Sequence, residues 1–64
     1  MRVMVYLDWG LVDPGMAMHV LAMMNEEFGI LALASDHFDE MDFMFMWEGK
    51  TKNGKLVMIE ISPL

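Results

Sequence analysis

The 64-residue sequence contains no cysteine, so neither a disulfide framework nor a zinc site with thiolate ligands can stabilise the fold. A chain of this length buries only about 60% of its unfolded surface. The apolar core therefore has to provide the stability. Hydrophobic residues make up 56% of the chain, and because a small core cannot hide them all, some must lie on the surface or in a subunit interface.

Basic residues are scarce, since four Lys and Arg stand against ten Asp and Glu and give a net charge of −6. Such a charge repels phosphate backbones and anionic lipid, so we expect no direct contact with nucleic acid or membranes. No apolar run approaches the roughly 20 residues that span a bilayer. The N-terminal Met1-Arg2-Val3-Met4 lacks the cleavage site of a signal peptide. These features predict a cytoplasmic protein.

Methionine, by contrast, is abundant, with ten residues. Its side chain is flexible and polarisable, which suits irregular cores and adaptable binding surfaces. The excess therefore indicates a binding surface, unless it reflects compositional drift or an artificial origin.

The first half of the chain shows one strand pattern and one helix pattern. Residues 2–9 alternate with a period of two, which predicts a strand whose odd positions face the core. Asp13-Pro14 is typical of an N-cap followed by the first helical residue. Apolar residues then recur at helical spacing as far as Phe28, and Gly29 stands where a left-handed C-cap is expected.

Further strands are predicted over residues 30–35, 43–50 and 56–61, with an acidic connection over residues 36–42. We find no linker or repeat. The sequence therefore predicts one α+β domain over residues 1–64, in which a single helix packs on a four-stranded, mainly antiparallel sheet in the order βαβββ.

The register of the last hairpin follows from the length of its loop. A two-residue turn at Asn53-Gly54 would mix aromatic and charged side chains on both faces. A three-residue loop over residues 52–54, with Gly54 in the left-handed position of a bulge, pairs Trp47 with Ile59 and Phe45 with Ile61. The second register separates an aromatic and aliphatic face from a methionine-rich face.

One helix covers only one face of a sheet, so the methionine-rich face is expected to stay open. The predicted core face carries Val3, Val5, Leu7, Phe43, Phe45, Trp47, Val57, Ile59 and Ile61. The predicted open face carries Met4, Tyr6, Asp8, Met44, Met46, Glu48, Lys50, Leu56, Met58 and Glu60. An apolar centre with a polar rim is typical of protein interfaces.

Patterns for catalysis and metal binding are weak. Residues 35–42 gather one His and four carboxylates, but they lack the glycine and the spacing of a calcium loop. A site with His19 and either Asp39 or Glu40 would require this segment to fold onto the helix. Ser35-Asp36-His37 are sequence neighbours and cannot adopt the geometry of a catalytic triad. We therefore expect no enzyme, no metal and no cofactor.

The chain resembles the phage uracil-DNA glycosylase inhibitors in its pattern. The segments concerned are the strand over residues 2–8, the following helix, Ile30-Leu31-Ala32-Leu33, the acidic residues 36–42 leading into Phe43-Met44-Phe45-Met46, and the hairpin with Asn53-Gly54 and residues 56–61. Those inhibitors imitate the charge of DNA and hold an apolar protrusion of the enzyme in a hydrophobic pocket. The chain departs from them at Trp9, where the family has Ser after the acidic residue that ends its first strand, and it lacks the family's extra N-terminal helix.

The resemblance implies a phage-encoded DNA mimic that acts in the host cytoplasm. It implies that Asp8, Asp39, Glu40 and Asp42 stand in for phosphates and that Met4, Met44, Met46 and Met58 line an apolar pocket.

We therefore expect a small acidic protein-binding domain that meets a basic protein surface, such as a DNA-binding enzyme. The predicted contact residues are Met4, Tyr6, Asp8, Asp39, Glu40, Asp42, Met44, Met46, Glu48, Met58 and Glu60. The alternative is a homodimeric structural or artificial domain without a heterologous partner.

Overall fold

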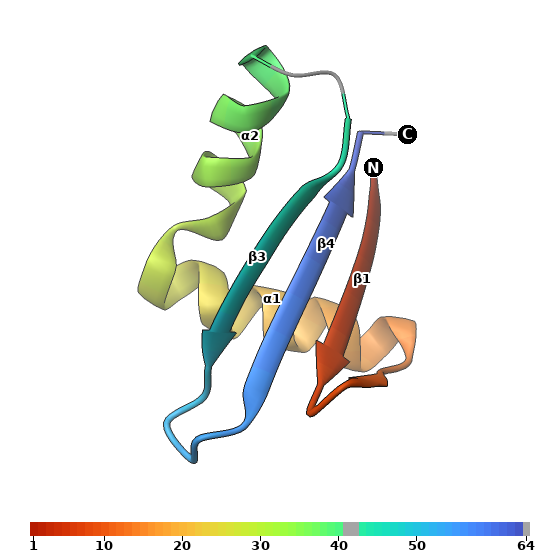
Figure 1. Cartoon of the computed structure of the whole chain (residues 1–64), viewed down its shortest axis with the longest axis vertical. Helices are drawn as coiled ribbons and strands as arrows, with labels where there is room; N and C mark the ends of the chain where they lie inside the picture. Colours follow the sequence, from red (N-terminus) through yellow and green to blue (C-terminus); the bar gives the residue numbers. More distant parts are fainter. Residues whose placement is uncertain (41–42, 64) are drawn as a thin grey trace.

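The computed structural model describes residues 1–40 and 43–63. Its elements are β1 (Arg2–Leu7), β2 (Gly10–Leu11), α1 (Pro14–Phe28), α2 (Ile30–Glu40), β3 (Phe45–Lys50) and β4 (Leu56–Ser62). The strands form one antiparallel sheet in the order β2-β1-β4-β3. In Figure 1 α1 crosses behind this sheet and α2 lies beside β3, and both helices contribute residues to the core on the same side of the sheet. The α+β class is confirmed, whereas the single helix and the βαβββ order are wrong.

Helix α1 begins and ends as predicted. The Asp13 carboxylate accepts a hydrogen bond from the Met16 backbone N–H at 2.8 Å, which satisfies a donor that the first helical turn leaves free. Gly29 adopts a left-handed φ of 64° and donates its N–H to the Asn25 carbonyl. These two caps explain why local signals were sufficient to place this helix.

Helix α2 replaces the predicted strand over residues 30–35, and the predicted acidic connection over residues 36–42 is helical as far as Glu40. Ile30 and Ala34 are buried four residues apart, while Ala32, which a strand would turn to the same side, is exposed. Leu and Ala are strong helix formers, and a short apolar run does not distinguish a buried strand from a helix. Phe38 continues the buried side at the helical spacing.

A tight turn joins β1 to β2. The first strand therefore ends at Leu7, whereas the sequence predicted that it would continue to Trp9. Leu7 pairs with Gly10, and the two turn residues Asp8 and Trp9 have positive φ angles of 47° and 72°. Positive φ at both positions is the geometry of a type I′ hairpin turn. Because Trp9 carries a β-carbon, this conformation costs roughly 1–2 kcal/mol relative to an ordinary one. The Trp9 side chain, predicted to face the core, is 73% exposed.

The β3–β4 hairpin has the predicted register, with Phe45 opposite Ile61 and Trp47 opposite Ile59. Gly54 has a φ of 82° and donates its N–H to the Thr51 carbonyl, which closes the three-residue loop. Strand β3 begins at Phe45, two residues later than predicted. Phe43 is 57% exposed rather than part of the core, although its ring lies 5.7 Å from that of His37.

The core lies between the sheet and the two helices. Its buried residues are Val5, Ala17, Val20, Leu21, Met24, Ile30, Ala34, Val57, Ile59 and Ile61. Phe28 and Trp47 close one side of it, with ring centres 5.2 Å apart.

No single helix in the described residues is long and apolar enough to cross a membrane. Taken together, α1 and α2 meet the requirements of length and composition, but they are bent by 88°.

Candidate partner-binding surface

The sheet has an open face, which we define as the outward side chains of its strands and of Met44. Because side chains alternate along a strand, burying Val5, Val57, Ile59 and Ile61 turns their neighbours to the other side. In Figure 1 α1 crosses behind the strands and α2 lies to the left of β3, so neither helix covers the face that is directed at the viewer. The residues of this face are Arg2, Met4, Tyr6, Leu11, Met44, Met46, Glu48, Lys50, Leu56, Met58, Glu60 and Ser62.

Cross-strand pairing arranges these side chains in rows. Tyr6 stands opposite Met58, which stands opposite Glu48, and Leu11 extends the row on the far side of Tyr6. Directly opposed side chains on one face are in contact range. The row therefore forms an apolar band across β2, β1 and β4 that ends at an acidic residue on β3.

The second row places Glu60 between Met4 and Met46. Since β4 is a central strand, this carboxylate lies in the middle of the open face and not on its rim. Glu60 is half-buried by its neighbours, whereas Met46 is 49% exposed. The open face thus has an acidic group surrounded by methionines.

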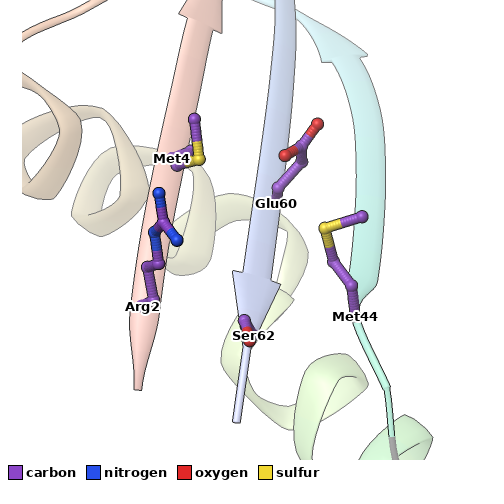
Figure 2. A pocket seen from close by; sticks show the side chains of 5 residues that line it. All are labelled: Arg2, Met4, Met44, Glu60 and Ser62. Atoms are coloured by element: carbon purple, nitrogen blue, oxygen red, sulfur yellow. The ribbon is translucent and has the colours of Figure 1, made fainter. Parts of the chain in front are cut away.

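A shallow hollow of about 200 Å³ surrounds this carboxylate. Its lining residues are Arg2, Met4, Met44, Glu60 and Ser62. Figure 2 shows Glu60 on β4 between Met4 and Met44, with Arg2 running along β1 toward Met4. Ligand pockets usually measure about 300–1,000 Å³, so the hollow fits a single side chain better than a small molecule.

The rim of the open face carries both signs of charge. Lys50 lies on β3 beyond Glu48, and Arg2 lies at the start of β1. The side-chain hydrogen bonds found within residues 1–40 and 43–63 involve Asp8, Asp13, Asn25 and Thr51, so these open-face charges are not engaged in them. They remain available to a partner.

Asp8 has a structural role besides the predicted contact. Its Oδ1 accepts a hydrogen bond from the Leu56 N–H at 3.0 Å, and its own N–H donates to the Leu56 carbonyl at 2.9 Å. These bonds fasten the β1–β2 turn to the start of β4. The carboxylate remains exposed at that end of the sheet.

The predicted acidic cluster is separate from the methionines. Asp39 and Glu40 lie in the last turn of α2, in the helix layer, and both are exposed. That end of α2 lies at the top of Figure 1, to the left of the strands. Asp42, the third member of the cluster, lies outside the described residues. The structure therefore brings together Met4, Tyr6, Met44, Met46, Glu48, Met58 and Glu60, but not Asp39 or Glu40.

Sequence reasoning missed Leu11 and the exposure of Trp9. Leu11 is 60% exposed and belongs to a two-residue strand, too short to show a period. The turn residues Asp8-Trp9 lack the glycine that usually marks a type I′ turn. The sequence therefore offered no signal for either residue.

The two histidines lie in different surroundings. His19 is exposed on α1, whereas the ring of His37 lies 5.6–5.7 Å from those of Phe38, Phe43 and Phe45. Its Nε2 is buried and has no hydrogen-bond partner among the described residues. Within the same residues, no group of three or more His, Asp or Glu is arranged to hold a metal ion.

Comparison with known proteins returned no matching family model, no matching curated protein and no matching solved structure.

Proposed function

We propose that this chain is a protein-binding domain that uses the open face to hold an apolar patch of its partner. The observation that carries the proposal is the uncovered band of Leu11, Tyr6 and Met58 with Met4 and Met46 beside it, on a sheet whose helices all lie on the other side. An apolar patch of this kind on a small protein is typical of an interaction surface. Methionines adapt their shape to a partner at little cost.

Glu60 and Glu48 specify the charge of that partner. A carboxylate in the centre of an apolar interface must be paired when water is expelled, because an unpaired buried charge is strongly destabilising. A lysine or arginine of the partner that enters the hollow would meet Glu60 among the methionines. The proposed partner therefore has a basic side chain next to an apolar patch.

A more specific version of the proposal is that the partner is an enzyme that normally holds nucleic acid, and that the chain inhibits it as a DNA mimic. The net charge of −6 and the exposed carboxylates of α2 support this form, because a basic nucleic-acid groove attracts such a field and speeds the encounter. In this version Asp8, Asp39 and Glu40 take the place of phosphates. Residues 30–33 are one of the segments on which the resemblance to the phage inhibitors is based. Because they form a helix and not the predicted strand, the resemblance rests on fewer elements.

A matched pair of variants tests the open face. Met44→Lys with Met46→Lys adds two charges to it, at side chains that are 43% and 49% exposed. Met18→Lys with Leu33→Lys adds the same charge to the helix layer, at side chains that are 54% and 46% exposed. In capture from a bacterial lysate, a specific partner should be retained by the wild type and the helix variant but lost by the sheet variant. A partner retained equally by all three proteins would refute the proposal.

Salt dependence separates the DNA-mimic form from a purely apolar contact. Because exposed charges are screened beyond about 8 Å at physiological ionic strength, binding that relies on the acidic field should weaken steadily as salt rises. Competition by duplex DNA for the same enzyme provides the second readout. Binding that is insensitive to both would remove the DNA-mimic form and leave the protein-binding form intact.

The alternative function is self-association through the same open face. It predicts a dimer that the sheet variant dissociates and the helix variant does not. Sedimentation velocity of the three proteins measures this directly.

A further inference from the structure

A groove separate from the open face runs between α1 and the β3–β4 loop. It measures about 860 Å³, roughly four times the volume of the hollow around Glu60. Its helix wall includes Met16 and Met23, which are 45% and 46% exposed. These two methionines lie on one side of α1, seven residues apart, and His19 and Val20 line the same wall between them. The groove therefore offers a second apolar surface.

The two walls of the groove carry equal and opposite charge. Glu26 and Glu27 lie on the helix wall, and Lys52 and Lys55 lie on the loop wall. All four side chains are exposed, and none takes part in the side-chain hydrogen bonds found within residues 1–40 and 43–63. The groove is thus locally neutral in a chain whose net charge is −6.

We propose that this groove is a two-fold interface between two copies of the chain. A two-fold axis applies the same surface twice, so every residue of the interface must find its complement within that surface. The groove meets this condition when the helix wall of each copy, with its methionines and carboxylates, faces the lysine-bearing loop wall of the other copy. Glu26 and Glu27 of one copy face Lys52 and Lys55 of the other, and the same pairs form again across the axis.

The methionines supply the apolar centre of the interface. Met16 and Met23 of each copy lie on the same helix wall as Glu26 and Glu27, so they pack against the aliphatic stems of the lysines in the other copy's loop, and the four ion pairs form the rim. The local match of charge overcomes the repulsion between two acidic copies, because charges farther apart than about 8 Å are screened at physiological salt.

The geometry leaves the open faces of both copies uncovered. The groove lies on the helix side of the sheet, since α1 forms one of its walls. The dimer would therefore present two partner-binding surfaces at once, which increases avidity for a partner with repeated sites. The dimer does not depend on the proposed function and can be tested without a partner.

Charge-swap variants of the full chain test the interface by sedimentation velocity over a wide range of concentration. The wild type should dimerise. Lys52→Glu with Lys55→Glu makes both walls negative, and Glu26→Lys with Glu27→Lys makes both walls positive. Each variant alone should dimerise on the order of tenfold or more weakly, because like charges then face each other across the axis. Circular dichroism confirms that the exposed substitutions leave the fold intact.

Mixing the two swap variants provides the decisive result. The negative walls of one variant face the positive walls of the other, so an equimolar mixture should form heterodimers, and a chain with all four substitutions should again form homodimers. Asp36→Lys with Asp39→Lys changes net charge as much as the Glu→Lys pair but lies outside the groove, and it should not break the dimer.

Three results would overturn the proposal. The first is a wild type that stays monomeric at the highest concentration it tolerates. The second is a dimer that persists in both swap variants. The third is a mixture of the swap variants that fails to form dimers. In the second case, a dimer that is lost only in Met44→Lys with Met46→Lys would assign the contact to the open face instead.

Discussion

The two layers of the molecule differ in charge. All four basic residues belong to the sheet and its hairpin loop, whereas α1 and α2 carry five carboxylates and neither Lys nor Arg. The open face of the sheet combines two acidic residues with two basic ones around a methionine centre. Under the proposed function, the sheet makes the close contacts with the partner, where apolar burial counts, and the helices provide the acidic field, which acts over distance.

Four of the five helix carboxylates also lie where they stabilise the fold least. Glu26 and Glu27 are in the last turn of α1, and Asp39 and Glu40 are in the last turn of α2. The dipole of a helix makes its C-terminal end negative, so acidic residues there are unfavourable. The acidic residues of the helix layer are therefore better explained by an interaction or by solubility than by stability.

The largest loss of stability should come from a substitution on the buried face of β4, compared with one on its open face. Ile59 is fully buried, while Met58 beside it lies on the open face. Ile59→Ala should lower the free energy of unfolding by about 2–5 kcal/mol, a large part of the roughly 3–10 kcal/mol expected for 64 residues. Met58→Ala should cost less, because its side chain is only half-buried. Urea denaturation measures both, and equal losses would show that the open face is packed like a core.

Substitutions at Asp8 and Asp36 test whether a carboxylate of the sheet layer stabilises the fold while one of the helix layer does not. Asp8→Ala removes the acceptor for the Leu56 N–H and should lower stability by about 1–2 kcal/mol. Asp36→Ala removes an exposed carboxylate from α2, where alanine is the better helix former, and should leave stability unchanged or slightly raised. Similar losses in urea denaturation would contradict the distinction between a structural carboxylate and a solvated one.

A substitution at Trp9 tests whether the exposed apolar side chain in the β1–β2 turn lowers the stability of the fold. Trp9→Gly removes the penalty of a β-carbon at a φ of 72° and gives up little packing, since the side chain is 73% exposed. We expect a gain of about 1 kcal/mol or less, because glycine also loses more entropy on folding. Reduced stability would mean that the indole makes contacts that matter for the fold. Increased stability with reduced capture of a partner would add Trp9 to the binding surface.

Local signals in the sequence were sufficient to predict α1 and the last hairpin. Asp13-Pro14 and Gly29 marked the ends of the helix, and Gly54 set the loop that determines the hairpin register. The open face followed from that register, because loop length decides which side chains share a face. These predictions succeeded because they depend on residues close together in the chain.

Features that depend on tertiary structure were missed. The buried side of α2 consists of Ile30 and Ala34 with half-buried His37 and Phe38, and its charged outer residues looked like a connection. The central position of Glu60 depends on β4 lying between β1 and β3, and strand order has no local signal in the sequence. The separation of Asp39 and Glu40 from the methionines follows from α2, so it was missed with that helix.

The smallest effect concerns the helix layer itself. Asp39→Asn removes one negative charge from the last turn of α2 and should raise the free energy of unfolding by roughly 0.3–1 kcal/mol at low salt. The gain should shrink as salt is added, because it arises from the helix dipole and from repulsion by Asp36, three residues away.

Ala32→Lys is the matched control, since it makes the same change of charge in the first turn of the same helix. There the dipole disfavours a cation, so stability should not rise. A gain that is independent of salt, or equal in the two variants, would remove the dipole explanation. If the acidic helices serve the encounter with a basic partner, Asp39→Asn should also slow association at low salt while it stabilises the chain. Opposite changes in stability and association rate are expected where a charge is kept for binding at a cost to the fold.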